Sequence, residues 1–310
     1  MMRHAAWVAA VLATACAPAG ARTGPGASVE PAAIDSARLM HDIGVLAHDS
    51  MEGRLVGSPG GARARAFLER AFRERGLQPV GGSSLLHEFT FTRRDTAVTG
   101  VNVVGAVRGT ELPAQYIAVT AHYDHVGIRN GEIYNGADDN ASGTAALLAL
   151  ADWFVRHPPR HSLIFAAFDA EEGGLNGARA FVANPPVARE AIILNVNMDM
   201  VGRNDAGELY VAGTRHYPQL LPYVQRVASA AEVTLIPGHD SPDPRPADDW
   251  TTASDHGAFH RAGIPFLYFG VEDHPDYHRP TDELSGIQPG FYARAVRTVL
   301  SAVRLLDAEL

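Results

Sequence analysis

The feature that most constrains the fold is an alternation of short apolar runs with longer segments of helical periodicity. Residues 102–107 and 116–121 are rich in strand-forming residues, and 162–168 is an almost continuous apolar run, typical of a strand buried on both faces. Residues 141–157 instead repeat leucine and phenylalanine at helical spacing. Such alternation predicts a mixed, mostly parallel sheet with helices on both faces.

The alternation continues over the rest of the chain, without an internal repeat or a domain boundary. At 310 residues the chain is long enough for one large domain with a buried core. We therefore predict a single three-layer α/β domain over residues 32–310. The other expected elements are helices at 36–47, 62–75, 175–183, 218–231 and 289–310, and strands at 191–197 and 265–269.

The N-terminal segment has the pattern of an export signal. Arg3 precedes an apolar stretch, 5–15, which is too short to span a bilayer and ends at Cys16. Residues 12–16 approximate a bacterial lipobox, and ordinary cleavage near Ala-x-Ala is the alternative. We expect a signal peptide at 1–16, a flexible tether at 17–31, and an exported protein. It would be a periplasmic or cell-envelope lipoprotein anchored at Cys16, or otherwise a secreted protein.

The charge of the chain argues against nucleic acid as a partner. The formal net charge is −9 and no block of basic residues is present. No segment after the signal is apolar for long enough to span a bilayer, so a lipid on Cys16 would be the only membrane attachment.

Polar residues follow three of the expected strands directly. His122 and Asp124 come after 116–121, Glu171 and Glu172 come after 162–168, and Asp199 comes after 191–197. Taken singly, such fragments are more often a structural His–Asp pair, a solvated turn or a helix cap. Ligands bind outside the carboxyl ends of strands in open α/β sheets, so their joint occurrence predicts one site.

Six stretches of this chain resemble the co-catalytic di-zinc aminopeptidase family, which also includes glutaminyl cyclases and glutamate carboxypeptidases. They occur in the family's order from about Met51 to the C-terminus, and the departures, at Ala170 and Ala178, are small. The stretches are 121–127 (AHYDHVG), 136–143 (GADDNASG), 168–175 (FDAEEGGL), 197–202 (NMDMVG), 254–256 (SDH) and 276–282 (DYHRPTD).

The resemblance implies a zinc-aminopeptidase fold and a role for each matching residue. His122 and Asp199 would hold the first of two zinc ions, and Glu172 and His278 would hold the second. Asp139 would bridge both ions. Imidazole and carboxylate are ligands that zinc accepts, and a bridging carboxylate suits a two-metal site.

The resemblance also implies the reaction, in which water activated by the zinc pair hydrolyses the first peptide bond of a substrate with a free N-terminus. Glu171 would act as general base, and Tyr277 would donate to the oxyanion. Asp124 would orient His122, and Asp255 would belong to the same outer network. The neighbouring His125, His256, His260 and His274 are expected to have structural or outer roles.

Three rival functions are compatible with parts of this pattern. A glutaminyl cyclase shares the fold but uses one zinc ion, and it usually lacks the Asp139–Asn140 pair. A non-catalytic binding homologue would have lost metal ligands, whereas the five expected ligands and the base are present here. The third rival, a carboxypeptidase, belongs to a branch with larger extra domains that do not fit in this chain.

A Pro- and Asp-rich stretch, 238–250, precedes the SDH motif and lacks a periodic apolar pattern. We predict an ordered loop near the mouth of the site. In this hypothesis the acids of the loop and Trp250 form one wall of the substrate cleft.

Overall fold

The computed structural model describes residue 2 and residues 33–241 and 249–310. The predicted signal peptide apart from residue 2, with Cys16, and the whole of the tether lie outside these ranges, as does the middle of the loop at 238–250. Within the described chain, an eight-stranded sheet forms the centre of the domain. Its strands are, in spatial order, β1 (Leu86–Arg93), β2 (Thr96–Val107), β6 (His161–Phe168), β3 (Leu112–His122), β7 (Ile192–Met198), β10 (Phe266–Gly270), β8 (Glu208–Ala212) and β9 (Thr234–Pro237).

The four central strands are parallel and the sheet is mixed, as predicted. Strands β6, β3, β7 and β10 run in the same direction, and antiparallel β2 and β8 flank them. The sequence did not predict β1, β8 or β9. Strands β1 and β9 form the two edges of the sheet, and β8 lies next to β9. Strand β1 is largely solvent-accessible and β9 has only four residues. Strands in such positions lack the long apolar run that marks a buried strand in the sequence.

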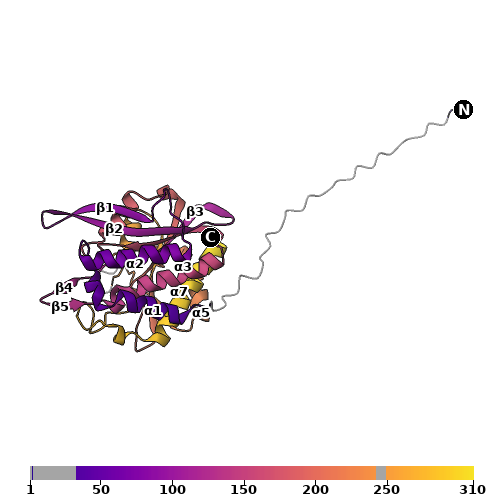
Figure 1. The fold of residues 1–310 in the computed structure, drawn as a ribbon. Coiled ribbons are helices and arrows are strands. Elements are labelled where there is room, and N and C mark those ends of the chain that lie inside the picture. The colour runs from indigo at the N-terminus through magenta and orange to yellow at the C-terminus, as the bar shows by residue number, and fades with distance from the viewer. Residues whose placement is uncertain (1, 3–32, 242–248) are drawn as a thin grey trace.

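Helices cover both faces of the sheet, which confirms the predicted single α/β domain. Val119 and its alternate neighbours pack into one core, and Ala118 and its alternate neighbours pack into the other. Figure 1 shows α1, α2, α3 and α7 together on one side of the sheet. The first core includes α1 (Ser36–Leu46), α2 (Pro59–Arg75), α3 (Gly143–Arg156), α5 (Leu221–Ala230) and α7 (Pro289–Glu309), and the second includes α4 (Asn176–Ala183) and α6 (His256–Arg261).

Local capping explains where the first two long helices begin and end. The side chain of Asp35 accepts a hydrogen bond from the N–H of Arg38 at the start of α1. Helix α2 begins earlier than predicted, because Ser58 caps the N–H of Gly61. It ends as predicted at Gly76, which adopts the left-handed conformation.

Shorter elements connect the layers. None of the helices in the described ranges is long and apolar enough to cross a membrane. The short elements are a two-stranded sheet of β4 (Gly127–Arg129) and β5 (Glu132–Tyr134), and the helical turns η1 (Asp49–Arg54), η2 (Ala137–Ser142), η3 (Arg189–Ala191), η4 (Pro218–Leu220) and η6 (Leu284–Gly286).

Candidate metal centre and active site

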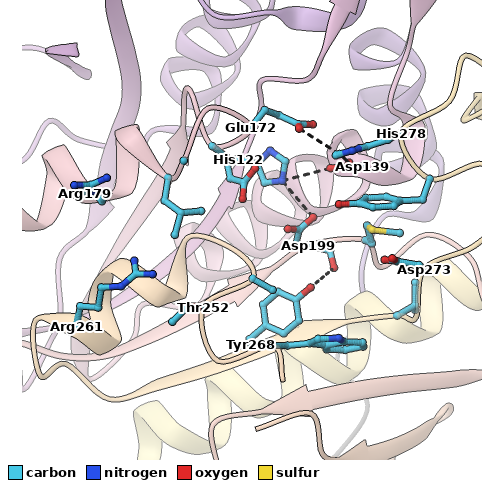
Figure 2. Close-up of a pocket in the computed structure, with 18 residues that line it drawn as sticks. His122, Asp139, Glu172, Arg179, Asp199, Thr252, Arg261, Tyr268, Asp273 and His278 are labelled. Carbon is cyan, nitrogen blue, oxygen red and sulfur yellow. Dashed lines mark hydrogen bonds and ion pairs between the residues drawn. The ribbon is translucent and has the colours of Figure 1, made fainter. Parts of the chain in front are cut away.

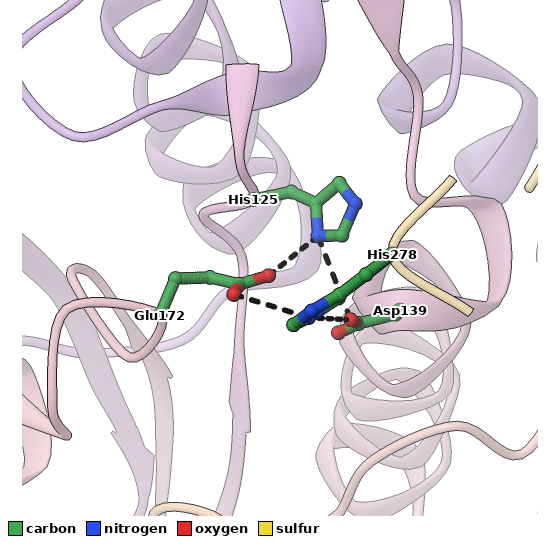
Figure 3. Close-up of side chains that lie close together, drawn as sticks. All are labelled: His125, Asp139, Glu172 and His278. Atoms are coloured by element: carbon green, nitrogen blue, oxygen red, sulfur yellow. Dashed lines mark hydrogen bonds and ion pairs between the residues drawn. The ribbon is translucent and has the colours of Figure 1, made fainter. Parts of the chain in front are cut away.

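Two groups of potential metal ligands meet beyond the carboxyl ends of the parallel strands. In each group, one donor atom per residue lies within 4.8 Å of the others. Figure 3 shows the larger group, in which three of the members come from three different loops and converge on Asp139. The groups are His125, Asp139, Glu172 and His278, and His122, Glu171 and Asp199.

Asp139 lies between the two groups and directs one carboxylate oxygen to each. Its Oδ1 is 3.5 Å from Nε2 of His122, and its Oδ2 is 3.0 Å from Nε2 of His278. On either side, His122 Nε2 lies 3.3 Å from Asp199 Oδ1, and His278 Nε2 lies 3.2 Å from Glu172 Oε2. The five residues predicted as zinc ligands are therefore neighbours in space, with Asp139 at the centre (Figure 2).

The spacing of the donor atoms suits a shared metal ion better than direct hydrogen bonds between the donors. His122 Nε2 and Asp199 Oδ1 are buried and have no hydrogen-bond partner among the described residues, which is costly for polar atoms that bind nothing. Zinc bonds of about 2.0–2.1 Å in a tetrahedron place ligand atoms about 3.3 Å apart. The separations of 3.0–3.5 Å around Asp139 match that spacing.

The turn that carries Asp139 is held by carboxylate and amide groups around it. The peptide bond between Asp139 and Asn140 is cis. Asp282 accepts hydrogen bonds from the N–H groups of Asp138 and Asp139, and Asn140 accepts from the N–H of Gly143 at the start of α3. The side chain of Asp138 accepts the N–H of Gly202, so Asp138 and Asn140 make structural contacts and Asp139 is left for the site.

Arg54 is a residue that sequence reasoning missed. Its side chain is fully buried and donates to five main-chain carbonyl oxygens, including those of Tyr123 at 2.7 Å and Gly136 at 2.9 Å. Burial lowers the pKa of Arg54 to about 10, while Asp139 and other nearby carboxylates raise it. Arg54 therefore ties the segment after His122 to the turn before Asp139.

A sequence signal for Arg54 existed in the Gly-rich connection at 51–61. Gly53 has a φ of +65°, and a Cβ there would overlap the carbonyl oxygen of Tyr134. Only glycine fits such a turn easily, and the turn directs the next side chain, that of Arg54, into the protein. A glycine next to a single basic residue in an otherwise loop-like stretch was the available clue.

The two consecutive glutamates that follow β6 have different surroundings. Glu172 lies between His125 Nδ1, at 2.6 Å, and His278. Burial raises its pKa, but the hydrogen bonds with the two histidines outweigh burial and lower it. Burial raises the pKa of Glu171 well above the usual range, opposed by His122. A raised pKa on one carboxyl group and a lowered pKa on its neighbour are typical of an acid–base residue next to a metal ligand.

The three remaining predicted residues surround the two groups. Asp124 accepts the N–H of Glu171 at 2.9 Å, and its carboxylate is 3.8 Å from Nδ1 of His122. Asp255 is fully buried, its oxygens have no hydrogen-bond partner in the described ranges, and burial raises its pKa to about 7. The ring of Tyr277 stacks on His278 with centroids 4.0 Å apart.

The histidines near the motifs have different positions. His125 joins the larger donor group, so the structure places it nearer the centre than the outer role expected for it. Its position three residues after His122 was the only sequence signal. His256 contacts the carbonyl of Trp250, His260 contacts the hydroxyl of Tyr217, and His274 lies 3.2 Å from Asp138.

A cleft with a volume of about 670 Å³ opens onto the donor groups. Trp250, at the end of the predicted loop, lines it beside Tyr268. The indole of Trp250 stacks on His239 with centroids 3.8 Å apart. Residues 242–248 of the loop lie outside the described ranges, and among its described residues only Trp250 lines the cleft.

Comparisons with known proteins agree with this geometry. The chain is 31% identical over 243 residues to Aminopeptidase YwaD of Bacillus subtilis, an alignment that covers 74% of this chain and 50% of the relative. Other relatives are named probable zinc metalloproteases, for example in Pyrenophora teres f. teres at 32% identity over 149 residues, which cover 45% of this chain and 31% of that protein. The chain spans half or less of the length of these curated relatives.

Solved structures show the same fold at low sequence identity. An aminopeptidase from Aneurinibacillus sp. strain AM-1 superposes with a TM-score of 0.69 at 19% identity, covering 87% of this chain and 93% of that one. The model of the family described as Peptidase family M28 matches residues 102–303. Because this match covers well over half of the 310 residues and includes the donor groups, the chain belongs to peptidase family M28.

Proposed function

We propose that this protein is a zinc-dependent aminopeptidase that holds two zinc ions. The observation that carries the proposal is the position of Asp139, whose two carboxylate oxygens face two separate sets of donors. His122 and Asp199 would hold one ion and Glu172 and His278 the other. When bound, such a pair lowers the pKa of water and polarises a carbonyl group.

The chain's own residues supply the proton transfers and the orientation. Glu171 lies in the cleft beside His122 and Asp199, where it takes a proton from the attacking water and returns it to the leaving amine. Its main-chain N–H is fixed by Asp124, which also lies beside His122. Tyr277 lines the same cleft and donates its hydroxyl proton toward the oxyanion.

The charges of the cleft favour a free amino terminus. Acidic side chains cluster around the donor groups, and Asp273 adds another carboxylate to the lining. An ammonium group close to these acids gains Coulomb energy that an acylated terminus would lack. Peptides with a free N-terminus are therefore the proposed substrates.

The alternative function for which a solved structure matches this chain is that of a glutaminyl cyclase. A Bacteroides thetaiotaomicron glutaminyl cyclase superposes with a TM-score of 0.72 at 18% identity, covering 89% of this chain and 99% of that one. At this identity the similarity shows the fold alone. The carboxylate of Asp139 shared between two donor sets favours the peptidase.

Metal analysis combined with an activity panel tests the proposal. We expect about two zinc equivalents per chain, hydrolysis of aminoacyl-nitroanilides, loss of activity with a chelator, and recovery with zinc. Pyroglutamate formation should be negligible. Full activity at one equivalent, together with pyroglutamate formation from an N-terminal glutamine, would favour the cyclase instead.

The proposed location rests on the sequence alone. The segment before Cys16 is the basis for proposing an exported protein, lipid-anchored at the cell envelope or secreted.

A further inference from the structure

The cleft carries two arginines in addition to its acids. Arg179 and Arg261 line it together with Leu175, while the acids belong to the donor groups and Asp273. In Figure 2 the two arginines lie on one side of the view, and Asp273 and His278 lie on the other. The cleft therefore has a basic end and an acidic end.

Packing between two helices brings the arginines to the same end. Arg179 is in the first turn of α4, and Arg261 is the last residue of α6. The helices pack against the same face of the sheet, where the rings of Phe181 and Phe259 have centroids 5.9 Å apart. The fold thus places two positive charges at one end of the cleft although 82 positions, 261 minus 179, separate them in the sequence.

Neither arginine side chain makes a polar contact with the part of the chain that the structure describes. Both residues are exposed, and within the described ranges no hydrogen bond or ion pair involves either side chain. By contrast, Arg203 pairs with Asp276 at 2.7 Å. Two guanidinium groups with no partner among the described residues present several N–H donors in the planar arrangement that binds carboxylates.

We propose that Arg179 and Arg261 bind a carboxylate on the part of the substrate that follows the scissile bond. The direction follows from the proposed function, on which this inference rests. The ammonium group of the substrate would lie at the acidic end of the cleft, beside Asp273, and the two arginines lie on the opposite side of the cleft (Figure 2). The leaving segment therefore extends toward the arginines.

Two sources of carboxylate share this chemistry. One is the C-terminal carboxylate of a di- or tripeptide, whose ammonium group would lie at the acidic end of the cleft. The other is an acidic side chain after the scissile bond in a longer peptide. Both place opposite charges of the substrate against opposite charges of the cleft.

Three peptides separate these sources: Leu-Gly-Gly, its C-terminal amide, and Leu-Asp-Gly amide. We expect the wild type to have a KM for at least one carboxylate peptide about tenfold lower than for the neutral amide, because hydrogen bonds to charged groups are the stronger ones. The double substitution Arg179→Gln and Arg261→Gln should remove this preference while kcat for the neutral amide stays unchanged. The favoured peptide identifies the source.

Binding measured by calorimetry in a Glu171→Gln background makes the result independent of turnover. A carboxylate preference in binding that disappears in the arginine variant supports the inference, even if the wild type hydrolyses none of the peptides and the proposed function fails. Equal dissociation constants for the acid and the amide in this background would overturn the inference. If the wild type hydrolyses the peptides efficiently at the same time, the proposed function stays intact. Arg108→Gln, an exposed arginine outside the cleft lining, is the matched control and should change nothing.

Discussion

Arg54 Nη2 donates a hydrogen bond to the carbonyl oxygen of Gly136 at 2.9 Å, across 82 positions of sequence. Gly136 begins the turn that presents Asp139, whose two carboxylate oxygens face the two donor groups. The same guanidinium binds the carbonyl of Tyr123, next to His122. One buried side chain thus joins the two segments that carry central donors of the site.

Removal of this guanidinium should cost both stability and metal affinity. Arg54→Met keeps most of the volume but leaves five carbonyl oxygens without their donor, so we expect a loss of about 3–5 kcal/mol in the free energy of unfolding. Urea denaturation of metal-free protein measures this loss, and competition with a chelator measures zinc affinity. Arg73→Met, at an exposed position on α2, is the control and should stay within about 0.5 kcal/mol. Equal losses in both variants would contradict the role of Arg54.

Substitution of the two adjacent glutamates should affect different properties, turnover for Glu171 and zinc binding for Glu172. Glu171→Gln should retain zinc and lower kcat by about a hundredfold or more, because the proposed base is lost while the proposed ligands remain. Glu172→Gln should weaken zinc binding itself, since Glu172 belongs to the donor group around Asp139. Steady-state kinetics and metal analysis on the same preparations decide the matter. Near-normal turnover of Glu171→Gln would show that another group is the base.

Trp250 should influence which N-terminal residues are accepted. Trp250→Ala removes an aromatic wall of the cleft, so kcat/KM for large apolar aminoacyl-nitroanilides should fall by about tenfold relative to the alanyl substrate. Trp153→Ala removes the same side chain from α3, outside the cleft lining, and serves as the control. An unchanged substrate ranking in Trp250→Ala would mean that the end of the 238–250 loop only connects two elements.

Cys16 provides a test of location. If the lipobox is processed, labelled fatty acid should attach to the wild type, and Cys16→Ser should move the protein from the membrane fraction into the periplasm or medium. Attachment of label to neither protein, with the wild type already in the soluble fraction, would indicate ordinary secretion.

The central strands and the main helices could be predicted because their signals are local. The apolar runs of β3, β6 and β7 and the helical spacing of α3 determine their own structure and burial. The side strands β1, β8 and β9 could not, since such strands are stabilised by their neighbours more than by a pattern of their own.

The sequence by itself determined the class of fold, the family and the five candidate zinc ligands that the structure brings together. Those signals lie in short motifs, in which each polar group directly follows a strand or precedes a helix. Tertiary structure alone decided that Asp139 faces both donor groups, that His125 joins one of them, and that Arg54 binds the turn before Asp139. These relationships depend on contacts between residues far apart in the chain, whose geometry is fixed only when the sheet and its two helical layers pack together.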